Sequence, residues 1–496
     1  MKKQKPLARS AGVLFPVFSL PSCCENGTFG SEAYRFIDFL NSANQTYWQV
    51  LPLTPAGYGD SPYQSYSAFA GNPLYISPEF LASDGLISYK EEKKEYSDID
   101  YEKAYRKNNE LLKTAFKNFR PNESNAFTVF CIKNSHWLDN YAVFMAFKKY
   151  FNDKPWYEWD EEIKFRVKEP VNRLADKLSE DILFRKFCQY KFHSQWFRLK
   201  EYANKRNIKI IGDIPIYVSY DSADVWASPE LFMLDSKLVP RSVAGVPPDM
   251  FSQTGQLWGN PLYDWNAMEH DDFKWWRKRI SHTAELYDVI RIDHFIGMVN
   301  FYSIPYGEKN ALNGVWLKGP GEALIKAINE SRGNTAIIAE DLGPATKEVK
   351  KVLKKSGYPG MKLMEFAFDD TPFNENLPHN FDSNCVVYGG THDNETLCGY
   401  FSGSKKSVVT FAKSYLNVAK KSDIPWGIIR SAYASNASVA IFQLQDYLSL
   451  DNTARINTPS TVGINWKYRL PDSLLTDTIA KKIKDLTQTY ARSSKS

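Results

Sequence analysis

Three acidic residues in this chain stand at or just beyond the end of a short apolar run. Asp293 and Glu340 end the runs 289–293 and 336–340, and Asp393 follows the run 385–389. Runs of this length and composition are typical of buried strands. A carboxylate at the carboxyl end of a buried strand contributes little to packing, whereas this end of a (β/α)8 barrel carries the active site. Three acids are enough for a nucleophile, an acid/base and a helper at a glycosidic bond.

The strands that must position these acids can be identified from the same kind of apolar run. Most candidates are followed by a helical pattern, such as those at 324–329 and 346–355. Eight strands that alternate with helices predict a closed parallel barrel. We therefore predict an α/β fold of the (β/α)8 TIM-barrel class with inserted, mainly helical subdomains. The expected strands are 13–17, 47–51, 208–213, 289–293, 336–340, 361–367, 385–389 and 437–442.

The spacing of these strands is uneven and indicates two insertions. The second and third strands are far apart, and the segment between them is rich in helical pattern, for instance at 142–151 and 182–198. We expect residues 1–496 to form a single catalytic barrel in which 55–205 is an inserted helical subdomain. A second insertion at 220–288 carries a Gly-Val-Pro-Pro-Asp segment that favours a shaped active-site loop at 243–249.

The overall composition is that of a globular protein with a large core. The chain is 43% hydrophobic and 24% charged, with a net charge of +5 and no basic stripe that would indicate nucleic-acid binding. It contains 13 Trp, 29 Tyr and 31 Phe. Most of these rings must be core, but a sugar-binding cleft also uses such rings. No apolar stretch approaches the roughly 20 residues that span a bilayer, so we expect no membrane partner.

The remaining motifs give no indication of a bound group. No phosphate-binding glycine loop occurs, and no cluster of His and Cys has metal-ligand spacing. We therefore predict no metal in the active site and no cofactor, although a structural ion stays open. The six cysteines form no C-x-x-C pair and favour free thiols in a reducing compartment, hence a cytoplasmic protein.

The N-terminus allows two interpretations. Lys2, Lys3, Lys5 and Arg9 precede an apolar run that ends near Cys23, which resembles a signal peptide with a lipidated cysteine. Two prolines interrupt that run. We therefore favour a first barrel strand that starts near Gly12.

At these segments the chain resembles the 4-α-glucanotransferases of the amylomaltase (disproportionating enzyme) family, which are relatives of the α-amylases. The resemblance covers nearly the whole chain. The matching motifs follow one another in the order of the family, and together they are far more specific than any one of them. They lie at 12–14, 19–22, 48–53, 59–65, 212–215, 221–226, 245–249 and 256–261, and the three acidic segments follow.

The resemblance implies a role for each matched residue. Asp293 resembles the nucleophile, Glu340 the general acid/base, and Asp393 the third acid, which binds sugar hydroxyls in the transition state. The further residues that the resemblance assigns to substrate binding are Tyr63, Asp213, Asp249, Trp258, Arg291, His294, Asp369 and His392. Among these, Tyr63 resembles the ring that stacks under the donor sugar, and Trp258 an acceptor-side contact. The implied substrates are maltodextrins and other α-1,4-glucans.

The chemistry requires that the two central acids start in opposite protonation states. Glu340 must carry a proton for the leaving oxygen, while Asp293 must be ionised to attack the anomeric carbon. Arg291 lies two residues before Asp293 and shares its strand face. We expect its guanidinium to lower the pKa of Asp293, and crowding by the other acids to raise the pKa of Glu340.

Several alternatives stay open. Asp293 alone could be a strand-end cap tied to Arg291, Glu340 a helix cap, and Asp393 part of a turn, while His294 and His392 could be core histidines and both aromatic rings could simply pack. The same three acids also serve an α-glucan hydrolase, so transfer rests on the resemblance. A non-catalytic glucan-binding relative would have lost an acid, and all three are present.

The chain departs from the family pattern near its C-terminus. Ser460 and Ile464 occupy positions where glycine is usual in the family. This affects our expectation for local loop geometry or chain-length preference, not for the chemistry. The sequence leaves open donor and acceptor length, cyclic products and the oligomeric state.

Overall fold

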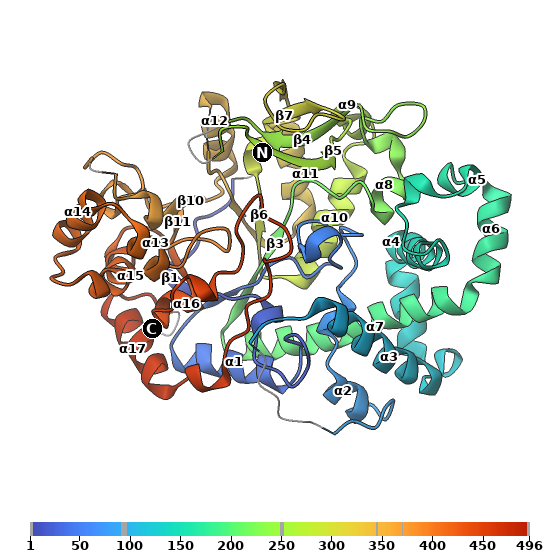
Figure 1. Ribbon diagram of the computed structural model, residues 1–496, viewed down its shortest axis with the longest axis horizontal. Coiled ribbons are helices and arrows are strands. Elements are labelled where there is room, and N and C mark those ends of the chain that lie inside the picture. Colours follow the sequence, from blue (N-terminus) through green and yellow to red (C-terminus); the bar gives the residue numbers. More distant parts are fainter. Residues whose placement is uncertain (1–2, 91–96, 249–251, 344–345, 370, 494–496) are drawn as a thin grey trace.

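Eight parallel strands form the centre of the molecule (Figure 1). The computed structural model describes residues 3–90, 97–248, 252–343, 346–369 and 371–493. Neighbouring strands pair in the order β10-β11-β12-β1-β2-β3-β6-β9. The ring is completed where the N–H of Ala339 donates to the carbonyl of Pro359 at 3.0 Å, which confirms the predicted (β/α)8 barrel. The strands are β1 Ser10–Leu14, β2 Tyr47–Gln49, β3 Lys209–Ile214, β6 Val289–Ile292, β9 Ala336–Ala339, β10 Gly360–Leu363, β11 Cys385–Tyr388 and β12 Val439–Gln443.

All eight predicted strands occur, and two of them have bounds that differ from the prediction by more than two residues at an end. The first was expected at 13–17 but ends at Leu14, because Pro16 has no N–H to pair and residues 17–19 turn into a short 3-10 helix. The strand expected at 361–367 ends at Leu363, where Met364–Phe366 form another 3-10 turn. Residues 10–14 lie in the barrel wall, as in the favoured interpretation of the N-terminal apolar run.

Alternation along the strands separates the barrel interior from the helix-facing surface. In β6, Ile290 and Ile292 pack outward against the helices, whereas Val289 belongs to the cluster inside the barrel. Arg291 and Asp293 share the parity of Val289, so they face the interior. The same reasoning places Asp213 with Ile211, and Glu340 with Ile338.

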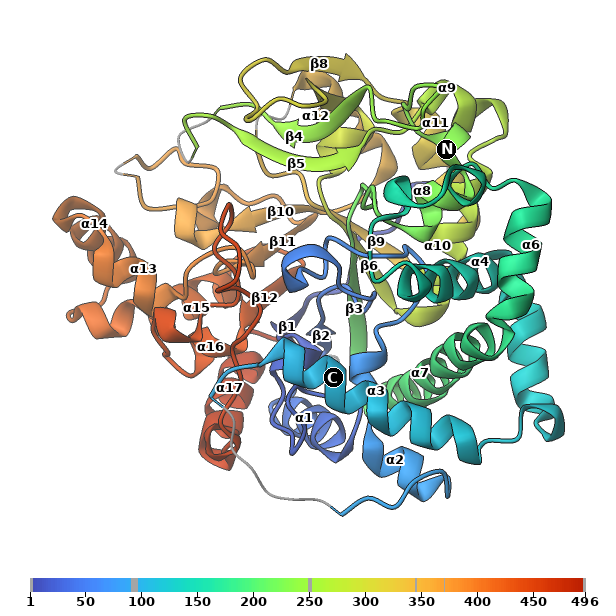
Figure 2. The same cartoon turned by 45° about the vertical axis from the view of Figure 1, so that its right-hand side comes forward.

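Helices flank the barrel on the left, on the right and below in Figures 1 and 2. None of the helices that the structure describes is both long and apolar enough to cross a membrane. Between β10 and β11 the described residues form short 3-10 turns in place of an α-helix. The helices that connect or follow barrel strands are α1 Ser31–Ser42, α7 Ser179–Lys205, α10 Lys274–Leu286, α11 Glu322–Ser331, α12 Lys347–Ser356, α13 Leu397–Gly403, α14 Lys406–Leu416, α15 Ile424–Ala434, α16 Leu444–Tyr447 and α17 Asp477–Thr489.

The long segment between β2 and β3 is helical and extends to the right of the barrel in Figure 1. Its last helix, α7, packs on α1 and β3 and returns the chain to the sheet, as a barrel helix does. We therefore propose that the inserted part of 55–205 ends before α7. Its helices are α2 Pro78–Ser83, α3 Tyr101–Asn118, α4 Asn125–Tyr150, α5 Glu161–Lys164 and α6 Lys168–Lys177.

A second sheet, which the sequence analysis missed, lies above the barrel in both views (Figures 1 and 2). It is antiparallel in the order β5-β4-β7-β8 and draws its strands from both sides of β6. Most of the segment expected as a loop at 243–249 is the strand β4, because β7 supplies its partner from beyond the predicted insertion. The elements are β4 Ser242–Val246, β5 Gln256–Pro261, β7 Asn300–Pro305 and β8 Val315–Lys318, with the short helices α8 Ala223–Ala227 and α9 Trp265–His270.

Candidate active site

A buried guanidinium joins two of the predicted acids at the carboxyl end of the barrel. Nη1 of Arg291 donates to both carboxylate oxygens of Asp213, at 2.7 and 2.6 Å, and lies 3.0 Å from Oδ1 of Asp293. The side chains of Arg291 and Asp213 are only 3% and 0% exposed. Burial acts to lower the pKa of Arg291, but the two carboxylates outweigh it and raise that pKa. The cation is therefore permanent.

Asp293 lies between this cation and the other acids. Burial raises the pKa of the Asp293 carboxyl, Asp213, Glu340 and Asp393 add to the rise, and Arg291 opposes it. Arg291 thus acts in the expected direction, but burial and the neighbouring acids outweigh it, so the pKa of Asp293 is raised and not low. The same cation is also shared with Asp213.

Glu340 is held next to Asp293 by backbone hydrogen bonds. Its Oε2 accepts the N–H of His294 at 2.7 Å, and its Oε1 accepts the N–H of Leu342 at 2.8 Å. His294 can present its N–H in this way because it adopts a left-handed conformation, with φ of 51°. Burial raises the pKa of Glu340 to about 7, against the opposing effects of Arg291 and the two N–H groups. This direction agrees with the expectation for an acid that starts protonated.

Asp393 follows β11 in a turn and is positioned by a distant segment. Its Oδ1 accepts Nδ2 of Asn457 at 2.6 Å and lies 3.3 Å from Nε2 of His392. Nη2 of Arg455 donates to its backbone carbonyl at 2.8 Å. The sequence analysis assigned no role to Asn457 or Arg455. Both lie in or beside a motif that differs from the family pattern, but no strand or acid there marked them as neighbours of Asp393.

Aromatic rings surround the side of the site near Asp213. The hydroxyl of Tyr63 donates to Oδ2 of Asp213 at 2.7 Å, and its ring stacks on that of His392 with centroids 5.0 Å apart. Trp466, which the sequence analysis also missed, lies within 6.0 Å of both rings. Burial lowers the pKa of His392, so this imidazole is neutral at pH 7.

A second aromatic contact lies on the side of the antiparallel sheet. Trp258 on β5 meets the ring of His294 edge-on, with centroids 4.9 Å apart. Burial lowers the pKa of His294 to about 4, and its buried Nε2 has no hydrogen-bond partner among the residues that the structure describes. Nε2 of Gln64 donates to the carbonyl of Trp258 at 3.3 Å, which ties β5 to the loop that carries Tyr63.

The structure does not bring all predicted residues into this cluster. Asp249 lies outside the described residues. Asp369 is exposed, and its Oδ1 accepts the N–H of Thr371 at 3.4 Å. Of the two departures from the family pattern, Ser460 adopts a left-handed conformation with φ of 65°, which favours glycine, and Ile464 is 68% exposed. Asp249 and Asp369 stay predictions.

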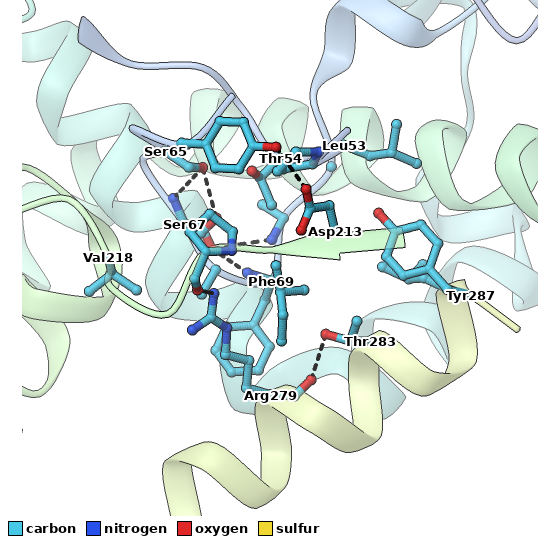
Figure 3. Close-up of a pocket in the computed structure, with 18 of the residues that line it drawn as sticks. Leu53, Thr54, Ser65, Ser67, Phe69, Asp213, Val218, Arg279, Thr283 and Tyr287 are labelled. Atoms are coloured by element: carbon cyan, nitrogen blue, oxygen red, sulfur yellow. Dashed lines mark hydrogen bonds between the residues drawn. The ribbon is translucent and has the colours of Figure 1, made fainter. Parts of the chain in front are cut away.

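A small internal cavity lies behind Asp213 (Figure 3). Figure 3 shows Asp213 on its strand, with Tyr287, Thr283 and Arg279 on the helix side and Ser65, Ser67 and Phe69 opposite. The volume is about 30 Å³, which is room for a water molecule and not for a sugar. The cavity is therefore not the sugar-binding cleft but a small space behind the side chains that hold Asp213.

The arrangement can supply both protonation states that a retaining reaction needs. Asp293 and Glu340 titrate as a pair, and Asp293 is the member in contact with Arg291. The shared negative charge is therefore more stable on Asp293, and the proton on Glu340. Among the residues that the structure describes, no group of three or more His, Cys, Asp and Glu could hold a metal ion.

Comparison with known proteins gives consistent matches over nearly the full length. A family model described as 4-alpha-glucanotransferase matches residues 15–476. A 4-alpha-glucanotransferase of Clostridium butyricum is 46% identical over 96% of this chain and 99% of its own length. That of Aquifex aeolicus is 44% identical over 98% and 99%. The structure of an amylomaltase from Streptococcus agalactiae in complex with acarbose is 40% identical, covers 98% of this chain and 100% of its own, and superposes with a TM-score of 0.95.

Proposed function

The chain belongs to the 4-α-glucanotransferase family, and we propose that Asp293, Glu340 and Asp393 are the residues that carry out its reaction. The enzyme is a glycosyltransferase that moves α-1,4-glucan segments from a donor to the 4-hydroxyl of an acceptor. One observation carries the assignment of roles. Burial raises the pKa of both carboxyls, and Asp293 is the one paired with the buried Arg291, at 3.0 Å, which favours the negative charge on Asp293 and the proton on Glu340.

The first half of the reaction forms a covalent intermediate. Glu340 gives its proton to the glycosidic oxygen while the ionised Asp293 attacks the anomeric carbon, so that the bond to the leaving glucan breaks. Asp393 binds hydroxyls of the donor sugar, and these bonds strengthen as the ring flattens toward the transition state. The stacked rings of Tyr63 and His392 offer a flat apolar face for the same sugar.

The second half decides between transfer and hydrolysis. Glu340, now ionised, removes the proton from the 4-hydroxyl of the acceptor, which then attacks the glycosyl–Asp293 bond with retention of configuration. Water could take the place of the acceptor, which is the reaction of a hydrolase. Trp258 beside His294 supports the acceptor-side role, because an aromatic face binds the incoming sugar and excludes water. The relatives are named as transferases, so hydrolysis is not favoured.

We also propose substrates, partners and a cellular compartment for the enzyme. We expect maltodextrins as donors and acceptors, no nucleic-acid partner, and action in the cytoplasm. Cys131, Cys188, Cys385 and Cys398 are free thiols, which supports a reducing compartment.

Product analysis from pure maltotriose tests the function. Transfer should produce glucose and a ladder of longer maltooligosaccharides, because each glycosyl–enzyme intermediate is passed to another glucan. Maltose and glucose alone would instead identify a hydrolase. The absence of any product would contradict both enzyme assignments.

A further inference from the structure

The third acid lacks the support that the other two receive. Asp293 and Glu340 are fixed by the strands β6 and β9 and by paired contacts, as described above. Asp393 comes five residues after β11 and precedes α13, so no regular element sets its position. Local bonds give the turn its shape, since Oδ1 of Asn394 accepts the N–H of Thr391 at 2.9 Å. These bonds fix the turn itself but not its direction relative to the barrel.

Arg455 and Asn457 of the C-terminal segment connect Asp393 in this turn to a distant part of the chain. Nη2 of Arg455 donates to the carbonyl of Asp393 at 2.8 Å, and Nε of Arg455 donates to the carbonyl of Asn457 at 2.7 Å. Asn457 in turn donates its Nδ2 to Oδ1 of Asp393 at 2.6 Å and its backbone N–H to the carbonyl of His392 at 3.1 Å. The four bonds form a closed set around Asp393.

We propose that Arg455 is a positioning residue that orients the Asp393 carboxylate for the transition state by bridging the backbone carbonyls of Asp393 and Asn457. The inference rests on the proposed role of Asp393. The planar fork of arginine carries donors in two fixed directions, whereas a lysine presents one ammonium and cannot hold both carbonyls in the same geometry.

A competing role for Arg455 is to neutralise the buried acid Glu365. Burial raises the pKa of Glu365 to about 8, with Glu395 and Asp446 adding to the rise and Arg455 opposing it. Glu365 is therefore largely uncharged at pH 7 and does not need a counter-ion there. The bonds that Arg455 donates go to the turn of Asp393 and to Asn457, which favours the positioning role.

The test compares Arg455→Met in two backgrounds, the wild type and Asp393→Asn. In the wild type we expect kcat for transfer from maltotriose to fall about 100-fold with KM within about threefold, because a misplaced catalytic group costs mainly transition-state binding. In the Asp393→Asn background, assayed with the same maltotriose donor, the same change should have almost no further effect on kcat. An equal loss in both backgrounds, or no loss in the wild type, would overturn the proposal.

Two further variants control the experiment. Arg455→Lys keeps the stem and charge but only one donor direction, so we expect an intermediate loss of about tenfold. If Arg455→Met does not fold, Arg455→Lys is compared in the wild-type and Asp393→Asn backgrounds instead. Arg332→Met is the matched control, because Arg332 also bridges two oxygens, those of Asn329 and Thr335, but at the opposite end of the barrel. We expect it to leave kcat unchanged, and a loss comparable to that of Arg455→Met would overturn the proposal.

The activities of the wild type and of Asp393→Asn show which of the three hypotheses fails. If the wild type forms no ladder from maltotriose, the proposed function fails whatever Arg455 does. If Asp393→Asn is as active as the wild type, the role of Asp393 fails. If both behave as expected and Arg455→Met acts independently of Asp393, only the inference about Arg455 fails.

Discussion

One cation and several acids determine the chemistry of this site. Arg291 is shared between Asp213, which holds it with two hydrogen bonds, and Asp293, which it contacts at 3.0 Å. Asp213 thus orients Arg291 but also competes for its charge. Burial is the main cause that raises the pKa of Asp293, Asp213 adds to the rise, and Arg291 opposes it, so the pair Asp293–Glu340 retains a proton near neutral pH.

Replacing the nucleophile should abolish transfer without unfolding the protein. We expect Asp293→Asn to lower kcat by about 10⁴-fold or more, because an amide cannot form the glycosyl intermediate. The side chain is 28% exposed, so the fold loses little. Product formation from maltotriose and the melting temperature check the two statements. Asp485→Asn on the exposed face of α17 is the control, and full activity of Asp293→Asn would contradict the assignment.

The raised pKa of Glu340 predicts how activity depends on pH. The acid must be protonated, so kcat/KM should fall as pH rises through about 7. Glu340→Gln should lose most activity and this basic limb together. If Glu340→Gln keeps the limb, another group is responsible for it.

The same pKa predicts an effect on stability. In the folded state Glu340 binds its proton up to about pH 7, but in the unfolded chain only up to about 4.5. The folded state therefore loses stability relative to the unfolded chain as pH rises from about 4.5 to 7, by up to about 3 kcal/mol. Glu340→Gln should thus melt at a higher temperature than the wild type at pH 8. Glu110→Gln on exposed α3 should show no such gain.

The partition between acceptor and water should depend on Trp258. We expect Trp258→Ala to raise the ratio of hydrolysis to transfer about tenfold, which corresponds to about 1.4 kcal/mol of lost acceptor binding. Glucose and chain-length analysis measures this ratio. Trp316→Ala is the matched control, because Trp316 lies on β8 of the same sheet and is 42% exposed. An unchanged ratio in Trp258→Ala would exclude an acceptor-side role.

The helices beside the barrel contain buried histidines that play no part in the reaction. His193 on α7 and His282 on α10 lie with ring centroids 5.8 Å apart, next to Trp137 of α4. Nδ1 of His193 is 2.8 Å from the carbonyl of Gln189, and its Nε2 has no hydrogen-bond partner in the described part of the chain. Burial lowers the pKa of His193 to about 4 and that of His282 to about 3.

These histidines should make the protein sensitive to acid. Since both pKa values are lower in the folded state than the ordinary 6.5, the unfolded chain binds more protons between about pH 6.5 and 4, and stability falls as pH falls through that range. Each histidine costs about 2 kcal/mol at pH 5. His193→Phe should therefore reduce the drop in melting temperature between pH 7 and pH 5, and the exposed control His270→Phe should not. Equal drops in all three proteins would exclude this cause.

The fold brings the four acids Asp213, Asp293, Glu340 and Asp393 together at the carboxyl end of the barrel. The reaction needs only the two carboxyls and the sugar contacts, and the described residues contain no candidate metal cluster. We therefore expect exhaustive dialysis against EDTA to leave the rate of transfer from maltotriose unchanged. Loss of activity that Ca²⁺ or Mg²⁺ restores would contradict this prediction.

The barrel and its acidic residues could be predicted from the sequence alone. Buried strands carry apolar side chains in runs of recognisable length, and residues at the carboxyl ends of parallel strands must meet at one end of the barrel. Asp213, Asp293, Glu340 and Asp393 were identified in this way and by resemblance. Local patterns also indicated helices within 55–205, and the stretches expected at 142–151 and 182–198 lie almost entirely in α4 and α7.

Other features depend on contacts between segments that are distant in the chain. Arg455 and Asn457 reach Asp393 only because the C-terminal segment folds back over the barrel, and β4 becomes a strand only because β7 lies beside it. The protonation of Asp293 depends first on its burial and then on Arg291 and on the neighbouring carboxylates, one of them contributed by β3. A sequence specifies which groups are present, whereas pKa values and hydrogen bonds depend on distances that exist only once distant segments have packed together.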